Sequence, residues 1–416
     1  MNPAFARLFK KVEQNRDRAV RGIYNVLPLP FENARKRLPG FGRKTYIIIT
    51  ANQKVGKTKF ADYLFVYKSI DYIMEGKTIK PHILYFTLED SAEDKMANFV
   101  EYLYYKIDNM LVDGKVLMSD DNDNPCPKWL IDKGQTEVYD KYYDKFMETV
   151  EFNVDQATGF SYSSVDKIYE ICISYAKEHG HYNYVKKRVY DPTYKCYLEE
   201  EVIDPTNPFT WDDENEMPII IIDNFANLEV PRGSTIYQEI ENMSKKCITL
   251  KNLGFIVVGV QHQAQEKESL TRRQANDVVP SAEGLDKNKS TAKDLTLLCG
   301  LMSPFKYEMR DFMGYDITRW KDNIRFFFVK EDRKYGAVNL KVPLLFIGES
   351  SIFEELPPYT DKEKLESVLN DLAEKKAEYD RNFYNNKSEK LLTLLTNKKK
   401  NIFARLKNTI KHWLQR

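Results

Sequence analysis

The residues best suited to chemistry form a candidate phosphate-binding loop at residues 51–58. The segment reads ANQKVGKT and fits the pattern G-x-x-x-x-G-K-[ST], except that alanine occupies the first position. Such a loop needs backbone N–H groups around a phosphate, a lysine that reaches the β and γ phosphates, and a hydroxyl on Mg²⁺. Gly56, Lys57 and Thr58 meet the last three of these needs. An apolar run at residues 46–50 precedes the loop and a helical pattern follows it, as this mechanism demands.

The loop predicts binding of ATP together with Mg²⁺, and hydrolysis would require carboxylates as well. One carboxylate must orient the attacking water, and a second must hold Mg²⁺ through its water shell. Glu89 and Asp223 each follow an apolar run directly, so we expect Glu89 to act on the water and Asp223, with Thr58, to bind the metal. Capping of a following helix is the alternative role for either acid. The residues expected around the phosphates are Ala51, Asn52, Gln53, Lys54, Val55, Gly56, Lys57 and Thr58.

Five apolar runs alternate with helical patterns along the chain. These runs lie at residues 46–50, 83–87, 218–222, 254–260 and 295–301. Because they are continuous rather than alternating, they are typical of strands buried on both faces of a parallel sheet. The expected fold class is therefore α/β, a mostly parallel sheet flanked by helices, with polar residues gathered at the carboxyl ends of the strands. Residues 324–329 and 337–346 resemble an antiparallel hairpin that ends the sheet.

The chain divides into three parts by pattern. Residues 1–21 form an expected N-terminal linker helix, residues 22–356 the core, and residues 357–416 a charged helical C-terminal extension. The core carries an insertion at about residues 105–215, with tyrosine-rich helices followed by a hairpin around Asp191 and Pro192. The linker helix has an apolar stripe that is expected to dock on a neighbouring subunit, made of Phe5, Leu8, Phe9 and Val12.

Composition limits the class of protein. A net charge of +1 over 416 residues excludes the basic excess of a small DNA-coating protein, so any contact with nucleic acid must come from local patches. Five cysteines without a C-x-x-C pair argue against a disulfide framework and indicate a reducing compartment. His179 and His181 have no second pair of ligands and predict no metal cage. No stretch reaches the roughly 18 apolar residues of a membrane span, so we expect a cytoplasmic location.

Read in order, the motifs resemble the motor domain of DnaB-type replicative helicases, a RecA-like P-loop ATPase. The matching segments are ANQKVGKT, YFTLEDSAED, IIIIDNFANLE and FIVVGVQHQ. The resemblance covers about residues 22–356 without the insertion, and an initial alanine in the loop is common in that family. It implies an ATP-dependent DNA helicase that works in replication as a homo-oligomeric, hexameric ring on single-stranded DNA.

The resemblance also assigns roles to residues outside the phosphate loop. Gln261 would be the sensor that couples the γ-phosphate to the DNA-binding loop, with Gln263 as its rival and a turn-capping role as the alternative. Lys330 and Arg333 match the basic finger that reaches into the next subunit's nucleotide, although a surface salt bridge would also explain Arg333. The loop that carries this finger is about one residue shorter than in the family, so its register is open.

Contact with DNA is expected from residues 265–289. Basic side chains there would bind phosphates in a salt-dependent way with little preference for sequence. A charge-mixed surface loop is the alternative, because several acids interrupt the segment. The candidate cations are Lys267, Arg272, Arg273, Lys287 and Lys289.

The two ends of the chain depart from the family's usual form. The segment before residue 46 is too short for the helical collar domain of many relatives, which suggests a phage or viral form acting in the host cytoplasm. At the other end, Ile402, Leu406, Ile410 and Trp413 lie on one face of a basic amphipathic helix. This helix or the insertion is expected to bind a replisome partner, while packing on the domain's own surface is the alternative.

Two other functions fit the same motifs. Residues 31–34 read FENA and match the F-x-x-A pattern by which some RecA/RadA-like recombinases polymerise into filaments. A nucleotide-binding scaffold or helicase loader is the other alternative, although such a protein could dispense with Glu89.

Overall fold

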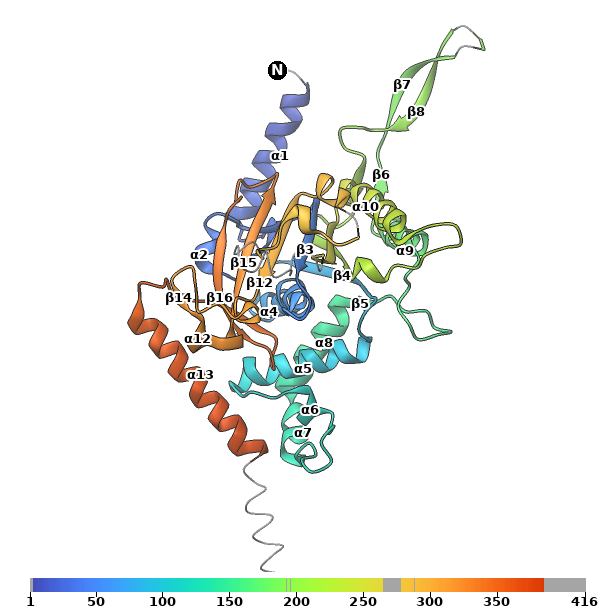
Figure 1. Ribbon diagram of the computed structural model, residues 1–416. Coiled ribbons are helices and arrows are strands. Elements are labelled where there is room, and N and C mark those ends of the chain that lie inside the picture. The colour runs from blue at the N-terminus through green and yellow to red at the C-terminus, as the bar shows by residue number, and fades with distance from the viewer. Residues whose placement is uncertain (1–2, 192, 195, 265–277, 288, 385–416) are drawn as a thin grey trace, which may run out of the picture.

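A single large sheet forms the centre of the protein (Figure 1). The computed structural model describes residues 3–191, 193–194, 196–264, 278–287 and 289–384. The strands of the sheet are β3 (Thr45–Ala51), β4 (Lys80–Thr87), β5 (Val150–Phe152), β10 (Glu216–Asp223), β11 (Ile256–His262), β12 (Leu297–Met302), β15 (Ile324–Asp332), β16 (Lys341–Ile347) and β17 (Ile352–Glu355). Their order across the sheet is β17-β16-β15-β12-β3-β11-β10-β4-β5.

The sheet is mostly parallel, which confirms the predicted fold class. Strands β12, β3, β11, β10, β4 and β5 run in the same direction. Strands β15, β16 and β17 are antiparallel to their neighbours. The predicted hairpin is therefore present as β15 and β16, but it does not end the sheet, because β17 pairs with β16 at the edge. A four-residue strand of sequence IFEE is too short to show a periodic pattern.

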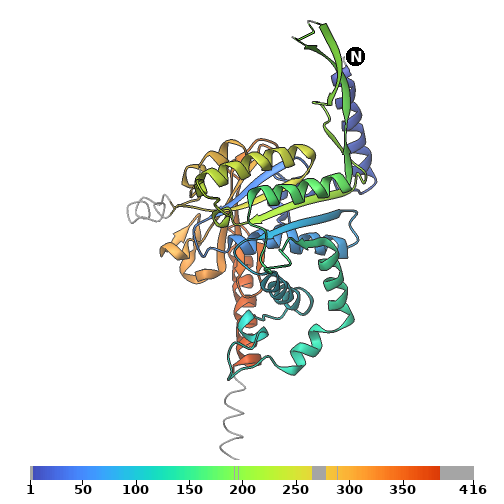
Figure 2. The ribbon, with the colours of Figure 1, turned by 90° about the vertical axis from the view of Figure 1, so that its right-hand side faces the viewer.

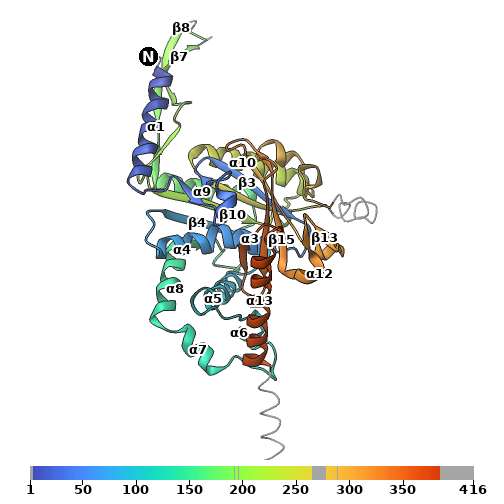
Figure 3. The same cartoon turned by 90° about the vertical axis from the view of Figure 1, so that its left-hand side faces the viewer.

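Two helical layers cover the sheet because successive strand residues face opposite sides. Ile47 and Ile49 of β3 belong to one buried cluster, whereas Tyr46 and Ile48 belong to the other. The first face packs against α3 (Lys57–Ala61), the π-helical turn η1 (Asp62–Tyr67), α4 (Lys68–Met74), α5 (Ala92–Asp108), α8 (Glu137–Thr149) and α13 (Lys362–Phe383). The second face packs against α9 (Val165–Glu178) and α10 (Ile236–Leu253). The two layers are seen edge-on in Figures 2 and 3.

Some of the predicted insertion is integral to this layered core. Strand β5 pairs in parallel with β4, with Val150 opposite Ile83. Helix α9 covers the second face through Ile168 and Cys172, which are fully buried. The remaining elements of this region are α6 (Gly114–Leu117), α7 (Lys128–Gly134), β6 (Gly180–Tyr182), β7 (Tyr184–Asp191), β8 (Cys196–Ile203) and β9 (Phe209–Trp211).

Two arms project from the same side of the body. The hairpin β7–β8 is one arm, and helix α1 (Pro3–Val20) is the other (Figures 2 and 3). Arg18 fixes the base of α1, with hydrogen bonds of 3.0 Å to Asn25 and 2.8 Å to Asn215. The apolar stripe of α1 is more than half exposed, at Phe5, Leu8, Phe9 and Val12. Within the described residues, no helix is long and apolar enough to cross a bilayer.

The segment before β3 packs into the core. Phe31 is 1% exposed and lies against the rings of Phe60 and Phe327, and Ala34 is also buried. A side chain enclosed in its own subunit cannot be offered to a neighbour, so the F-x-x-A segment no longer argues for a filament.

The predicted basic helix at residues 402–413 lies outside the described residues. The smaller elements are β1 (Val26–Pro28), α2 (Glu32–Arg35), β2 (Gly40–Gly42), η2 (Phe225–Asn227), η4 (Ala282–Gly284), η5 (Ser290–Lys293), η6 (Phe305–Tyr307), β13 (Asp311–Phe312), β14 (Tyr315–Asp316), α12 (Ile317–Trp320) and η7 (Lys321–Asn323).

Gly254 is expected to be essential for the turn from α10 into β11. Its φ is +119°, and a Cβ there would lie 2.5 Å from the indole nitrogen of Trp211. We expect Gly254→Ala to lower the free energy of unfolding by about 3 kcal/mol in urea titrations, through backbone strain and a steric clash. Gly76→Ala is the matched control, because Gly76 has a φ of +75° but open space around its Cβ. Strain alone should cost about 1 kcal/mol there; equal losses in both variants would contradict the packing argument.

Candidate functional site

The loop at residues 51–58 joins β3 to a long helical segment. Lys54 and Gly56 have positive φ values of 59° and 96°, which curl the backbone around the start of α3. A Cβ on Gly56 would lie 3.3 Å from the ring of Phe346, so a larger residue would require that ring to move as well as strain the backbone. No side chain caps the first turn of α3, whose N–H groups are therefore available to an anion.

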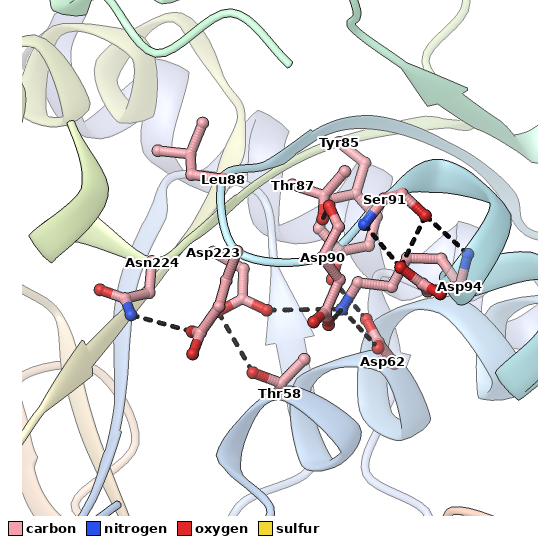
Figure 4. A network of polar contacts seen from close by, with 12 residues as sticks. Thr58, Asp62, Tyr85, Thr87, Leu88, Asp90, Ser91, Asp94, Asp223 and Asn224 are labelled. Carbon is pink, nitrogen blue, oxygen red and sulfur yellow. Dashed lines mark hydrogen bonds and ion pairs between the residues drawn. The ribbon is translucent and has the colours of Figure 1, made fainter. Parts of the chain in front are cut away.

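The predicted catalytic side chains converge on this loop. Thr58 donates its hydroxyl hydrogen to Asp223 Oδ1 at 3.3 Å (Figure 4). The Nζ of Lys57, a side chain only 8% exposed, lies 3.8 Å from Glu89 Oε2. Asp223 ends β10 beside Thr87 at the end of β4. Both acids therefore lie at the carboxyl ends of the parallel strands. The structure thus brings together Lys57, Thr58, Glu89 and Asp223, which the sequence proposes for phosphate, metal and water.

The two carboxylates have different electrostatic environments. Burial would raise the pKa of Glu89, but the hydrogen bond from Asn224 at 3.0 Å and the charge of Lys57 outweigh it and hold that pKa below its ordinary value. Burial raises the pKa of Asp223, while the ammonium of Lys95 opposes this rise. Glu89 is therefore kept ionised and partly open to solvent, as a group that must act on water should be.

Several residues at the site carry no local sequence signal. Lys95 on α5 is buried, and its Nζ lies 3.0 Å from Asp62, 3.2 Å from Asp90 and 3.4 Å from Asp223. Asn224 fixes Glu89 as described above. Because only the tertiary fold brings α5, η1 and the end of β10 together, spacing along the chain could not reveal this cluster.

Arg325 supports the loop from behind. This residue of β15 is 1% exposed, and its Nε donates to the carbonyl of Val55 at 2.8 Å. Its guanidinium lies 4.2 Å from the ring centroid of Phe346, the same ring that closes off Gly56. Lys306 donates to the carbonyl of Gln53 at 2.8 Å. Two long cationic side chains thus bind carbonyl oxygens of the loop, and neither of them occupies its N–H groups.

Both candidate sensor glutamines are buried at the end of β11. Gln261 donates to the carbonyl of Asp286 at 2.6 Å and accepts from the hydroxyl of Thr291 at 3.2 Å. Gln263 donates to Thr50 Oγ1 at 2.9 Å, and Ser281 donates its backbone N–H to the Gln263 carbonyl oxygen at 3.1 Å. Each glutamine therefore links the end of β11 to the predicted DNA-binding segment at residues 265–289, or to the residue just after it. Ser281 and Asp286 lie within that segment, and Thr291 follows it.

Of the proposed finger residues, Arg333 lies at the opposite end of the strands from the loop, whereas Lys330 is level with the middle of β3. Asp332, at the end of β15, is opposite Leu297 of β12, which in turn pairs with Ile47 near the start of β3. Lys330 falls at the β-bulge in this pairing, a feature that redirects a side chain. Arg333 donates to the carbonyl of Lys293 at 2.8 Å. Arg333 is therefore not placed to serve the loop of its own chain.

The predicted DNA-binding cations are described only in part. Lys287 and Lys289 are exposed. Lys267, Arg272 and Arg273 lie outside the described residues.

Comparisons with known proteins place the fold. No family model matches the sequence, and no curated protein matches it either. Among solved structures, the chain is similar to the ATPase domain of G40P, with a TM-score of 0.56 and 14% identity over 85% of this chain and 98% of that chain. It is also similar to a DnaB-like replicative helicase solved to study its interactions with primase, with a TM-score of 0.54 and 14% identity over 86% of this chain and 67% of that chain. The fold is thus the RecA-like one of helicase ATPase domains.

The donor set fits a magnesium-bound nucleoside triphosphate. The uncapped start of α3 and Lys57 suit phosphate oxygens, and the paired oxygens of Thr58 and Asp223 suit the shell of a small, hard cation. Lys57 would hold the phosphates, and Thr58 with Asp223 would hold the metal.

Arg325→Met should weaken nucleotide binding without any contact to the nucleotide. The substitution leaves the Val55 carbonyl without its donor and frees the loop to change shape. We expect the affinity for a fluorescent ATP analogue to fall about tenfold, equivalent to about 1.4 kcal/mol. Arg319→Met is the control, since Arg319 is exposed and pairs with Glu366 at 2.8 Å. Equal affinity for the nucleotide in both folded variants would refute a supporting role for Arg325.

Proposed function

We propose that this protein is an ATP-dependent DNA helicase of the DnaB-like type, which hydrolyses ATP to move along single-stranded DNA during replication. The convergence of Lys57, Thr58, Glu89 and Asp223 at one edge of the sheet carries this proposal. The likeness of the fold to helicase ATPase domains supports it.

Each of these residues has one task in hydrolysis. When bound, the magnesium ion supplies positive charge to the phosphates at the point where the bond breaks. Lys57 adds a second positive charge, and its burial strengthens that effect because little water screens it. Thr58 and Asp223 would hold that ion beside the phosphates. Glu89 accepts a hydrogen bond from water, and Asn224 keeps its carboxylate in place while it does so.

Movement on DNA requires a link from the phosphates to the DNA-binding segment. Gln261 and Gln263 provide it, because both hold residues 281–291 against the end of β11. We propose that Lys287 and Lys289, together with the cations at residues 267–273, face single-stranded DNA.

A complete site requires a second copy of the chain. Arg333 follows the end of β15, at the opposite end of the strands from its own loop, and we propose that it completes a neighbour's site together with Lys330. A ring in which each subunit offers this end of its strands to the next satisfies the requirement, and we propose a hexamer. The hairpin arm or the C-terminal extension is the proposed contact for a replisome partner.

Two variants separate nucleotide binding from hydrolysis. Lys57→Ala should abolish both, because it removes the phosphate's buried counter-charge. Glu89→Gln should keep nucleotide affinity within about twofold and lower hydrolysis at least 100-fold, since only the water loses its acceptor. Turnover with and without single-stranded DNA, alongside unwinding of a forked duplex, measures both effects. A wild-type protein that hydrolyses ATP but never separates strands would refute the helicase, and hydrolysis in no DNA context would favour a scaffold.

Mixing two inactive variants tests whether the finger acts on a neighbour. Lys57→Ala and Arg333→Ala should each be nearly inactive alone. In an equal mixture, about a quarter of the interfaces join an intact loop to an intact finger, so DNA-stimulated hydrolysis should reappear. A mixture of Lys57→Ala with Glu89→Gln is the control, because both defects lie in the same half of the site and no activity should return. Electron microscopy of the wild type with ATP and DNA would distinguish closed rings from the filaments of a recombinase.

A further inference from the structure

A buried lysine holds the far side of the carboxylate proposed to serve the metal. The side chain of Lys95 is 3% exposed, and those of Asp62 and Asp223 are 4% and 1% exposed. The Nζ of Lys95 donates to Asp62 Oδ2 at 3.0 Å and to Asp223 Oδ2 at 3.4 Å. Asp90 lies 3.2 Å from the same nitrogen. One ammonium therefore lies within 3.4 Å of three carboxylates and donates hydrogen bonds to two of them.

The two oxygens of Asp223 are divided between separate partners. Oδ1 accepts from Thr58 on the side of the phosphate loop, whereas Oδ2 accepts from Lys95 on the side of α5 (Figure 4 shows Thr58, Asp62 and Asp223). A hydrogen bond to one oxygen restricts rotation of the carboxylate, and so fixes the position of the other oxygen. Lys95 thus fixes which oxygen of Asp223 is presented next to Thr58.

Lys95 is itself anchored by a network that does not touch the phosphate loop. Asp62 Oδ1 accepts from the hydroxyl of Tyr85 at 2.6 Å, and its Oδ2 accepts from Lys95. Asp62 opens a π-helical turn, a rare form that is frequent at functional sites. The chain of contacts runs from Tyr85 in β4 through Asp62 and Lys95 to Asp223.

The stability of the core does not explain this cluster. A buried ion pair rarely stabilises a fold more than apolar residues of similar size would, because desolvation offsets the attraction. We propose that Lys95, anchored by Asp62, is a positioning residue that orients Asp223 for the magnesium ion of the bound nucleotide. This inference rests on the proposed nucleotide site and adds the residues that set the geometry of its metal ligand.

The experiment measures how much Mg²⁺ improves nucleotide affinity. A fluorescent ATP analogue is titrated in excess Mg²⁺ and again in EDTA, and the ratio of the two dissociation constants is the magnesium-linked gain. Lys95→Met should reduce this gain at least tenfold, as expected for a residue that orients a metal ligand, and leave the affinity in EDTA within about twofold. An unchanged or larger gain would overturn the proposal, because Lys95 would then not position Asp223.

Two further variants guard against trivial explanations. Asp62→Asn combined with Lys95→Met removes a buried carboxylate together with the ammonium that it pairs with, so it costs less stability than removal of the ammonium alone. This variant should show the same loss of gain, and full gain would overturn the proposal. Lys106→Met is the matched control on the same helix, since Lys106 lies 3.2 Å from the buried Asp71. It stands about 16 Å further along α5 and should keep the wild-type gain. A loss as large as that of Lys95→Met would show a general loosening of α5 and overturn the proposal.

The wild-type titration separates this inference from the proposed function. If the wild type and Lys57→Ala bind the analogue equally, with no gain from Mg²⁺, the nucleotide site itself is wrong and both proposals fall. If the wild type shows the gain and Lys95→Met keeps it, the proposed function stands and only the role of Lys95 is refuted.

Discussion

Burial of the central strands on both faces is the constraint on which the rest of the structure depends. Strands β3, β10 and β11 have essentially no exposed residue along their length, so a charged side chain within them would cost several kcal/mol of desolvation. Charge can enter only where a strand ends. Because β3, β4, β10 and β11 are parallel, their carboxyl ends form one edge, and the polar groups of the site gather there. The antiparallel β15 reverses this relation: Arg325 at its start reaches the phosphate loop, whereas Arg333 beyond its end lies at the other edge.

The same constraint explains how much of the fold and site could be predicted. A continuous apolar run that ends in an acid or a loop is visible in sequence, so β3, β4, β10, β11 and β12 and the acids at their ends could be found. Strands β5 and β17, of three and four residues, are too short to carry a pattern, and tertiary packing alone joins them to the sheet. Lys95 and Arg325 could not be found for a related reason, because a lone buried cation in a helix, or near the start of a strand, does not differ in sequence from an exposed one. Their partners lie far away in the chain.

The charged residues of the hairpin arm, which are close together in the sequence, pair across its two strands. Lys186, Lys187 and Arg188 of β7 lie opposite three consecutive glutamates of β8. Opposite charges across an antiparallel pair stabilise it, and a slip by two residues in either direction would keep only one of the three pairs. A two-stranded hairpin is marginal in water, so this pairing specifies the register of an arm with little core beneath it. The hairpin itself is predicted by the alternating pattern of residues around Asp191 and Pro192, and the charge pairs add its register; its purpose cannot be predicted from either.

Each of the two carboxylates at the site has two partners, so it can lose one of them when a ligand binds and still keep its position. Glu89 contacts both Lys57, at 3.8 Å, and Asn224, at 3.0 Å. If Lys57 turns to another anion, Asn224 still holds Glu89 in place. Asp223 is likewise held from two sides, by Thr58 and by Lys95. Each carboxylate therefore keeps one anchor outside the phosphate loop, and ligand exchange at the loop need not move either of them. Since Lys95 lies on α5 and donates to Asp62 of η1, motion of those elements would reach Asp223 through Lys95 rather than through the loop.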